Sequence, residues 1–138
     1  MALRKNAKLE LLKRVPLFSQ CTRPQLQEIA GIADEIDFRE GKQLAREGSA
    51  GREFFVIVEG TAEVTKGRRK LRTLSDGDFF GEISLITKLP RTATVTTVSP
   101  THALVITERS FRRMLDRSPR IRLNVLEALG ERLGATDL

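Results

Sequence analysis

A run of short β-prone segments separated by turn residues is the feature that most constrains how this chain can fold. Seven of the ten glycines lie between Gly41 and Gly81, and they interrupt the segments at short intervals. The candidate strands are Glu35–Phe38, Gln43–Arg46, Glu53–Glu59, Thr61–Lys66, Lys70–Leu74, Ala93–Val98 and Ala103–Thr107. Short strands at this spacing close most naturally into a small antiparallel barrel or jelly roll.

Helical patterns precede this region. Leu9, Leu12 and Val15 recur at helical spacing, and the pattern stops before a proline. Thr22 and Gln25 have the spacing of a capping box, which marks the start of a second helix. We therefore expect helices over residues 1–34 and a β-rich region over residues 35–107.

Two further helices are predicted over residues 108–138. Thr107 is a candidate N-cap for the first, and Ser118 followed by Pro119 is a favourable start for the second. The apolar stripe of the second helix comprises Ile121, Val125, Leu126, Leu129 and Leu133. A chain of 138 residues with this organisation is expected to form one domain.

The residue inventory excludes several kinds of catalysis. The chain has one histidine, His102, and one cysteine, Cys21, so a multi-histidine metal site and an intramolecular disulfide are both excluded. Cys-His catalysis would need that single pair, whereas a turn position for Cys21 and a half-exposed strand position for His102 explain both residues without chemistry. We expect neither an enzyme nor a metal or cofactor.

The net charge of +6 is spread over the first helix, the run from Lys66 to Arg72 and the segment from Arg109 to Arg122. This dispersal favours solvated surface over a nucleic-acid interface. The longest apolar runs, such as Phe54–Val58, are too short to span a membrane. Cations interrupt the N-terminal apolar residues, so no signal peptide is predicted and a cytoplasmic location is expected.

One connection between candidate strands is too long for a hairpin turn. From residue 76 to residue 95 it reads Asp-Gly-Asp-Phe-Phe-Gly-Glu-Ile-Ser-Leu-Ile-Thr-Lys-Leu-Pro-Arg-Thr-Ala-Thr-Val. Gly81 permits close backbone approach, amides at Ile83 and Ser84 face an anion at the start of a helical turn, and Arg91 offers a planar fork of donors. Glu82 suits a sugar hydroxyl, because an ionised carboxylate only accepts hydrogen bonds. Together these residues indicate a nucleotide with a compact phosphate.

The same residues resemble the phosphate-binding cassette of the cyclic nucleotide-binding domain family, of the catabolite-activator and protein kinase A regulatory-subunit type. The matching segments are Phe80-Gly81-Glu82-Ile83-Ser84-Leu85 and Pro90-Arg91-Thr92-Ala93-Thr94-Val95. The supporting framework comprises Pro16-Leu17-Phe18, Arg46-Glu47-Gly48 with Gly51, Glu59-Gly60 and Gly77-Asp78-Phe79-Phe80. The resemblance extends from about residue 9 to residue 133 and implies an eight-stranded antiparallel β-roll with flanking helices.

The resemblance also implies a ligand, cyclic AMP or cyclic GMP, and a role for each cassette residue. Glu82 would accept from the ribose 2′-hydroxyl, and Arg91 would pair with the cyclic phosphate. The other expected ligand-binding residues are Gly81, Ile83, Ser84, Thr92 and Ala93, with Val64 and Leu71 as walls of the base pocket. Cyclic AMP is favoured as the commoner signal, although the Thr92 hydroxyl can accept from the guanine amino group and so admits cyclic GMP.

A ligand-gated rearrangement is the expected mechanism, with the final helix as a lid over the base. The lid candidates are Leu129, Arg132 and Leu133. Family members regulate an attached or separate protein, so a protein effector is expected. No output domain is expected in the 138 residues themselves. The sequence therefore predicts a stand-alone sensor or a regulatory fragment of a larger transcription factor, channel or kinase, and a start at Met1 slightly favours the first.

Overall fold

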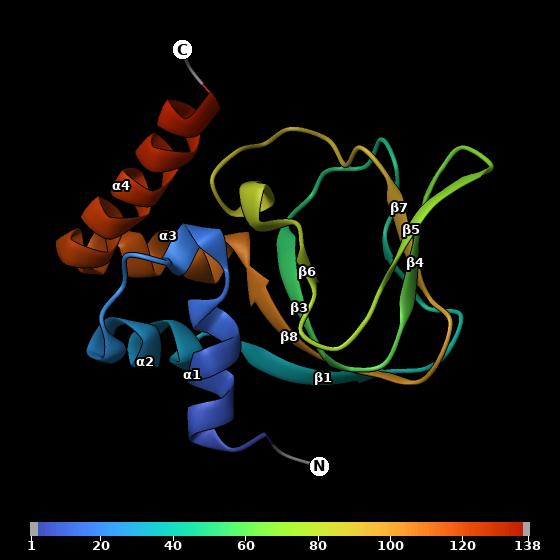
Figure 1. Cartoon of the computed structure of the whole chain (residues 1–138), viewed down its shortest axis with the longest axis horizontal. Helices are drawn as coiled ribbons and strands as arrows, with labels where there is room; N and C mark the ends of the chain where they lie inside the picture. Colours follow the sequence, from blue (N-terminus) through green and yellow to red (C-terminus); the bar gives the residue numbers. More distant parts are fainter. Residues whose placement is uncertain (1–2, 137–138) are drawn as a thin grey trace. The chain divides into compact units, whose positions relative to one another are not determined.

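A computed structural model of the chain describes residues 3–136 (Figure 1). The chain divides into two compact units. One is helical and combines the residues up to Ile32 with those from Arg109 onward, and the other is the β unit, Ala33–Glu108. Each unit is described by itself below.

The β unit consists of two four-stranded antiparallel sheets, as the predicted β-roll requires. The first has the strand order β1-β8-β3-β6 and the second the order β2-β7-β4-β5. The bounds are β1 Asp34–Phe38, β2 Gln43–Ala45, β3 Glu53–Glu59, β4 Ala62–Lys66, β5 Arg69–Leu74, β6 Phe79–Phe80, β7 Thr94–Thr97 and β8 Thr101–Thr107. The seven predicted strands are all present, with ends that differ by at most two residues.

Strand β6 is the element that the strand pattern did not predict. It has only two residues, and it pairs Phe80 with Phe55 and Phe79 with Val56 of β3. The rings of Phe55 and Phe80 stack with centroids 4.7 Å apart. A two-residue strand between turn residues carries no alternation of its own, so its pairing with β3 defines it. The total is eight strands, as the family resemblance implies.

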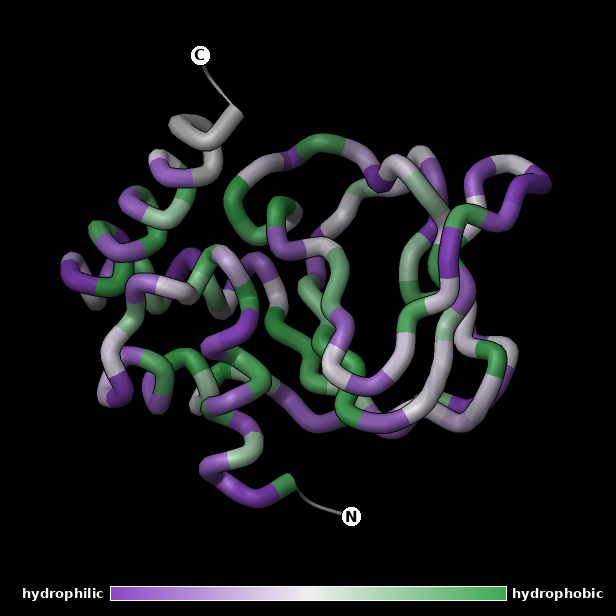
Figure 2. The backbone as a smooth tube through the Cα atoms, in the orientation of Figure 1, coloured by the Kyte–Doolittle hydropathy of each residue, from purple (hydrophilic) through white to green (hydrophobic). Residues whose placement is uncertain are grey.

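The core of the β unit lies on strands whose apolar residues are continuous rather than alternating. Phe54, Phe55, Val56 and Ile57 of β3 are all buried, and Figure 2 shows this strand as hydrophobic. Burial on both faces explains why the sequence lacks a polar residue there. The second sheet packs a smaller cluster against Ile57, made of Ala45, Ala62, Val64, Leu74 and Val95.

The helical unit is built around a buried aromatic pair. Its elements are α1 Lys5–Lys13, η1 Pro16–Phe18, α2 Arg23–Gly31, α3 Glu108–Arg117 and α4 Pro119–Thr136. The rings of Phe18 and Phe111 lie 5.9 Å apart between centroids. The predicted capping box is present, because the Thr22 backbone N–H donates to Gln25 Oε1 at 2.8 Å. Within the described residues, no helix combines the length and hydropathy needed to cross a bilayer.

One residue of the predicted α4 stripe lies on the wrong face. Ile121, Val125 and Ala128 are buried, whereas Leu126 is 58% exposed. The buried positions follow the i, i+4, i+7 spacing of a single helix face, and residue 126 lies one position away from it.

Cys21 is buried, and this burial raises the pKa of its thiol to about 11. Cys21 therefore stays neutral and is a poor nucleophile.

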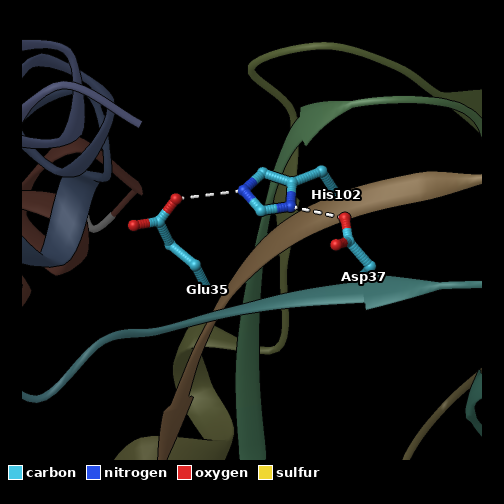
Figure 3. Close-up of polar contacts among 3 residues, drawn as sticks. All are labelled: Glu35, Asp37 and His102. Carbon is cyan, nitrogen blue, oxygen red and sulfur yellow. Dashed lines mark hydrogen bonds and ion pairs between the residues drawn. The ribbon is translucent and has the colours of Figure 1, made fainter. Parts of the chain in front are cut away.

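His102 joins the edge strand β1 to β8 by contacts with two carboxylates (Figure 3). Its Nδ1 lies 2.7 Å from Asp37 Oδ1 and its Nε2 lies 3.0 Å from Glu35 Oε1. Glu59 of β3 faces His102 in register from the other side. The hydrogen bond with Glu35 is the main cause of a raised His102 pKa, and burial of the ring opposes the shift.

A raised imidazole pKa makes the attachment of β1 dependent on pH. The stabilisation is fully present below the ordinary histidine pKa of 6.5 and is lost as the pH rises through the higher value of the folded state. Replacing Asp37 with asparagine should lower the unfolding free energy by up to about 1 kcal/mol near pH 6 and by almost nothing near pH 9. Urea titrations of both proteins at both pH values measure this.

Asp34→Asn is the matched control for that comparison, since Asp34 lies on the same strand and pairs in register with Val105 rather than His102. Its effect on the unfolding free energy should be the same at both pH values. An Asp37→Asn effect that does not change with pH would show that the imidazole charge is not involved.

Candidate functional site: a cavity in the β unit

A tight turn between β6 and β7 forms one wall of a cavity. Gly81 has a φ of +84° and precedes the short 3-10 helix η2, Glu82–Leu85. A side chain at residue 81 would be strained by this backbone conformation, and its Cβ would lie 2.8 Å from the Glu53 carbonyl oxygen. Glycine is therefore required for the turn to pass this close to β3.

The backbone of Arg91 is fixed by the loop between β2 and β3. The Arg91 N–H donates to the Ser49 carbonyl at 2.8 Å, and the Gly48 N–H donates to the Arg91 carbonyl at 2.9 Å. Next to them, Ala50 and Pro90 form an antiparallel bridge. These bonds anchor the base of a long side chain that would otherwise sample many positions.

The guanidinium of Arg91 is held between η2 and β3. Nη1 donates to Ser84 Oγ at 2.9 Å, and Nη2 donates to the Glu53 carbonyl at 2.5 Å. Gly51 leaves the space that this arrangement needs, because a Cβ there would lie 2.5 Å from Ser84 Oγ and 2.8 Å from Arg91 Nε. Two glycines, Gly51 and Gly81, thus make room for one arginine.

The charge of Arg91 is only partly compensated. Burial lowers the pKa of its guanidinium, and the Glu53 carboxylate opposes this shift. Both of the hydrogen bonds described above go to neutral oxygens. A guanidinium in such surroundings favours an anionic ligand that can accept two parallel hydrogen bonds.

The cavity beside Arg91 has a volume of about 390 Å³. This volume is in the range of pockets that hold small organic ligands. Strands β2, β4, β5, β6 and β7 contribute Ala45, Val64, Arg72, Phe79, Phe80 and Val95 to its lining. The turn and the segment that follows it contribute Gly81, Glu82, Ile83, Ser84, Arg91, Thr92 and Ala93. The sheet side of the cavity is thus apolar except for Arg72, and the other side is polar and carries both signs of charge.

Eight of the nine ligand-binding residues predicted from the sequence line this cavity, and Leu71 does not. The Leu71 side chain is 48% exposed. A register shift between Val64 and Thr65 explains the difference, because it pairs Val64 with Arg72 and leaves Leu71 as the extra residue of a β-bulge. Arg72 therefore shares the cavity side of the sheet with Val64, and Leu71 is corrected to a surface position.

Five lining residues were not predicted from the sequence, and Arg72 is the charged one among them; the other four are Ala45, Phe79, Phe80 and Val95. A bulge shifts the alternation of a strand by one residue. Because Arg72 lies in a run of cations, the sequence pattern does not distinguish it from its neighbours. The amide of Ser84 also differs from expectation. It donates to the Gly81 carbonyl at 3.0 Å within the 3-10 turn, so the hydroxyl, and not the amide, is the donor that Ser84 offers to a ligand.

The predicted lid residues lie on α4. Leu129 is half-buried. The side chains of Arg132 and Leu133 fall outside the described residues. The assignment of a lid therefore stays a prediction.

The sequence profile of a family described as "Cyclic nucleotide-binding domain" matches residues 35–118. This match covers more than half of the chain and includes the whole cavity lining. The chain belongs to the cyclic nucleotide-binding domain family. The resemblance read from the cassette residues is thereby confirmed.

Similar proteins include kinases and their regulatory subunits. The chain is 39% identical over 118 residues to a cAMP-dependent protein kinase regulatory subunit of Mycosarcoma maydis, covering 77% of this chain and 22% of that protein. It is 34% identical over 115 residues to the cGMP-dependent protein kinase, isozyme 1, of Drosophila melanogaster, covering 78% of this chain and 15% of that protein. The chain thus spans at most about a fifth of either relative.

Solved structures share the fold. The N-terminal domain of a transcriptional regulator from Streptomyces coelicolor A3(2) superposes with a TM-score of 0.85 and 28% identity, covering 92% of this chain and 94% of that one. A cyclic nucleotide-binding-like protein from Brucella abortus has a TM-score of 0.74 and 29% identity, covering 80% and 98%. The predicted fold class, a β-roll with helices, is confirmed.

The need for glycine at the turn can be measured directly. Gly81→Ala should lower the unfolding free energy by at least about 1–2 kcal/mol, because it adds left-handed backbone strain and a clash with the Glu53 carbonyl. Gly31→Ala is the matched control, since nothing lies within 4 Å of its added Cβ and its site is at the end of α2. That control should be neutral or stabilising. Equal effects of the two changes would contradict the role given to Gly81.

Proposed function

We propose that this domain binds a cyclic nucleotide in the cavity and acts as a regulatory sensor. The observation that carries the proposal is the pairing of a half-buried guanidinium with a buried carboxylate in one cavity of suitable size. Arg91 supplies the first and Glu82, which is 7% exposed, supplies the second. A ligand that satisfies both must present an anion and a hydroxyl donor, which a cyclic phosphate fused to a ribose does.

The phosphate would be bound by an exchange of partners. In the structure Arg91 donates to Ser84 Oγ and to the Glu53 carbonyl, and both acceptors are neutral. A phosphate oxygen accepts a shorter, charge-assisted hydrogen bond, which is roughly twice as strong. When a phosphate takes the guanidinium, the Ser84 hydroxyl becomes available as a further donor to the same anion.

Glu82 favours binding of a nucleotide over binding of inorganic phosphate. A carboxylate would repel inorganic phosphate, whereas it accepts a hydrogen bond from the ribose 2′-hydroxyl. Gly81, Ile83 and Ala93 lie along the same wall and would contact the sugar and phosphate through backbone and small side chains. This arrangement favours a ligand in which the sugar and the phosphate are held close together.

The base would lie against the apolar strands. Arg72 would influence whether the site prefers guanine or adenine. The sequence alone favours cyclic AMP. Arg72 and Thr92 now stand on the same cavity lining, with Val64 in register beside Arg72. An arginine fork pairs with O6 and N7 of guanine, and adenine offers no O6 acceptor. Arg72 therefore favours cyclic GMP, and we propose it as the preferred ligand.

A regulatory rather than a catalytic role is supported by the relatives named above. We propose that nucleotide binding changes how α4 packs and that a protein effector, attached or separate, responds to the change. A stand-alone sensor and a regulatory part of a larger transcription factor, channel or kinase are both consistent with the domain. The expected cytoplasmic location and the expected absence of nucleic-acid binding stay predictions.

The phosphate assignment is tested by Arg91→Ala. Removing the guanidinium should weaken cyclic nucleotide binding by about thirty-fold to several thousand-fold, because a desolvated phosphate loses its cationic partner. Calorimetric titration with cyclic AMP, cyclic GMP and linear AMP measures this, and circular dichroism checks the fold. Arg39→Ala removes one exposed arginine of the same unit and should leave affinity unchanged. Unchanged affinity in folded Arg91→Ala protein would refute the assignment.

Base selectivity is tested by Arg72→Lys and Thr92→Ala. Lysine keeps the charge but lacks the fork, so cyclic GMP should bind about five-fold to a hundred-fold more weakly while cyclic AMP changes little. Loss of the Thr92 hydroxyl should weaken cyclic GMP by about two-fold to twelve-fold. If a titration shows both nucleotides weakened equally, these side chains serve the phosphate and the preference for guanine is wrong.

A further inference from the structure

A basic surface on β5 and its hairpin is not used by the cavity. Lys66, Arg68, Arg69 and Lys70 are all exposed, and we call these four residues with the outer side of β5 the basic edge. The hairpin between β4 and β5 projects from the β unit in Figure 1, and its tip is strongly hydrophilic in Figure 2. Neither the core nor the proposed nucleotide site explains this concentration of charge.

The backbone of β5 is paired on one side only. In the order β2-β7-β4-β5 the strand is the end of its sheet, and its residues pair with β4. Every residue of β5 except Leu74 is exposed. Among the described residues, no other strand pairs with its outer side. Unpaired N–H and C=O groups on such an edge are a template for an additional strand.

The positive charge of the basic edge exceeds the negative charge next to it. Lys70 Nζ lies 4.0 Å from Glu63 Oε2, and the Glu47 carboxylate accepts from the Gly67 N–H at 3.0 Å. These two carboxylates face the four cations of the basic edge, Lys66, Arg68, Arg69 and Lys70. Leu71, raised by the bulge, adds one exposed aliphatic side chain among them.

We propose that an acidic, extended polypeptide segment of a partner protein binds along the basic edge as an additional β-strand. Its backbone would pair with the outer side of β5. Carboxylates on the two faces of the added strand would lie near Arg69 and Lys70, because these consecutive residues point to opposite faces of the sheet. Backbone pairing gives affinity in this mode, and charge and the Leu71 contact give specificity. The surface is separate from Arg91 and Glu82, so the proposal does not depend on nucleotide binding.

Other occupants fit this edge less well. A single-stranded nucleic acid is usually held by stacking of its bases on aromatic side chains, and residues 62–74 contain none. A second copy of the chain could offer its acidic strand β1, which is also the end of a sheet. The net charge of +6, however, makes two copies repel each other. An acidic partner is attracted by the same charge.

The test uses the full chain and a fluorescent peptide in which pairs of glutamates alternate with pairs of valines, so that both faces of the added strand carry carboxylates. Anisotropy should show binding that weakens steeply as salt rises, because the contacts are exposed charges. The same peptide with every residue N-methylated keeps its charge but has no backbone N–H group to donate to β5. It should bind at least about ten-fold more weakly, because hydrogen bonds to β5 are lost.

Charge-reversed variants locate the surface. Arg69→Glu with Lys70→Glu should abolish binding of the unmethylated peptide. Arg120→Glu with Arg122→Glu makes the same change in net charge on exposed positions of α4 and should retain most of the affinity. Hydrogen exchange of the β5 amides should slow when the peptide is bound to the native chain.

Three results would overturn the proposal. Equal binding of the N-methylated peptide would show attraction of charge without strand addition. Tighter binding of an oligothymidylate of equal charge would assign the edge to nucleic acid. Sedimentation that shows self-association of the native chain, abolished by the Arg69 and Lys70 reversals, would assign it to a second copy.

Discussion

The position of one guanidinium sets the geometry of the whole site. Arg91 is far along a long connection, yet its backbone is tied to Ser49 and Gly48 by two hydrogen bonds and its side chain to Ser84 and the β3 backbone by two more. These partners belong to three segments of the β unit: the β2–β3 loop, η2 and the start of β3. The loop holds the Arg91 backbone, and the other two segments hold its guanidinium. A ligand that takes over the guanidinium therefore releases the hydrogen bonds to η2 and β3 together.

The rest of the β unit can be understood as a rigid frame for that arrangement. β3 supplies the carbonyl of Glu53 and is itself held between β8 and β6 by an apolar run that is buried on both faces. Phe80 stacks on Phe55 and so fixes the chain just before Gly81. Apart from Arg72 of β5, the polar groups of the cavity lie on the turn and the segment after it, and apolar packing determines where the turn lies. This division allows a charged cavity to form in a small domain without an unsatisfied buried side chain among the described residues.

The sequence predicted the elements of this fold more reliably than the register between them. Strands such as β3 and the capping box at Thr22 follow from local patterns, which is why they were predictable. The sequence analysis also placed Gly81, Glu82, Ser84 and Arg91 together, and all four line one cavity. Their roles toward a nucleotide stay predictions. The bulge that places Arg72 in the cavity and Leu71 on the surface depends on pairing between strands, and no local pattern encodes it. The same limit applies to β6, which exists only through its contact with β3.

In strand β5 a single register shift places neighbouring residues on two separate surfaces. Without the bulge, alternation from Thr65 through the hairpin would place Leu71 beside Val64 and leave Arg72 facing outward, so that the cavity would have a purely apolar wall. The extra residue reverses this, so that Arg72 lines the cavity while the Leu71 side chain is exposed among cations. Because Arg72 and the basic edge share one backbone, a strand added on the outer side would restrain the same segment that lines the cavity. Binding at the two places would then be coupled, and any such coupling must be equal in both directions.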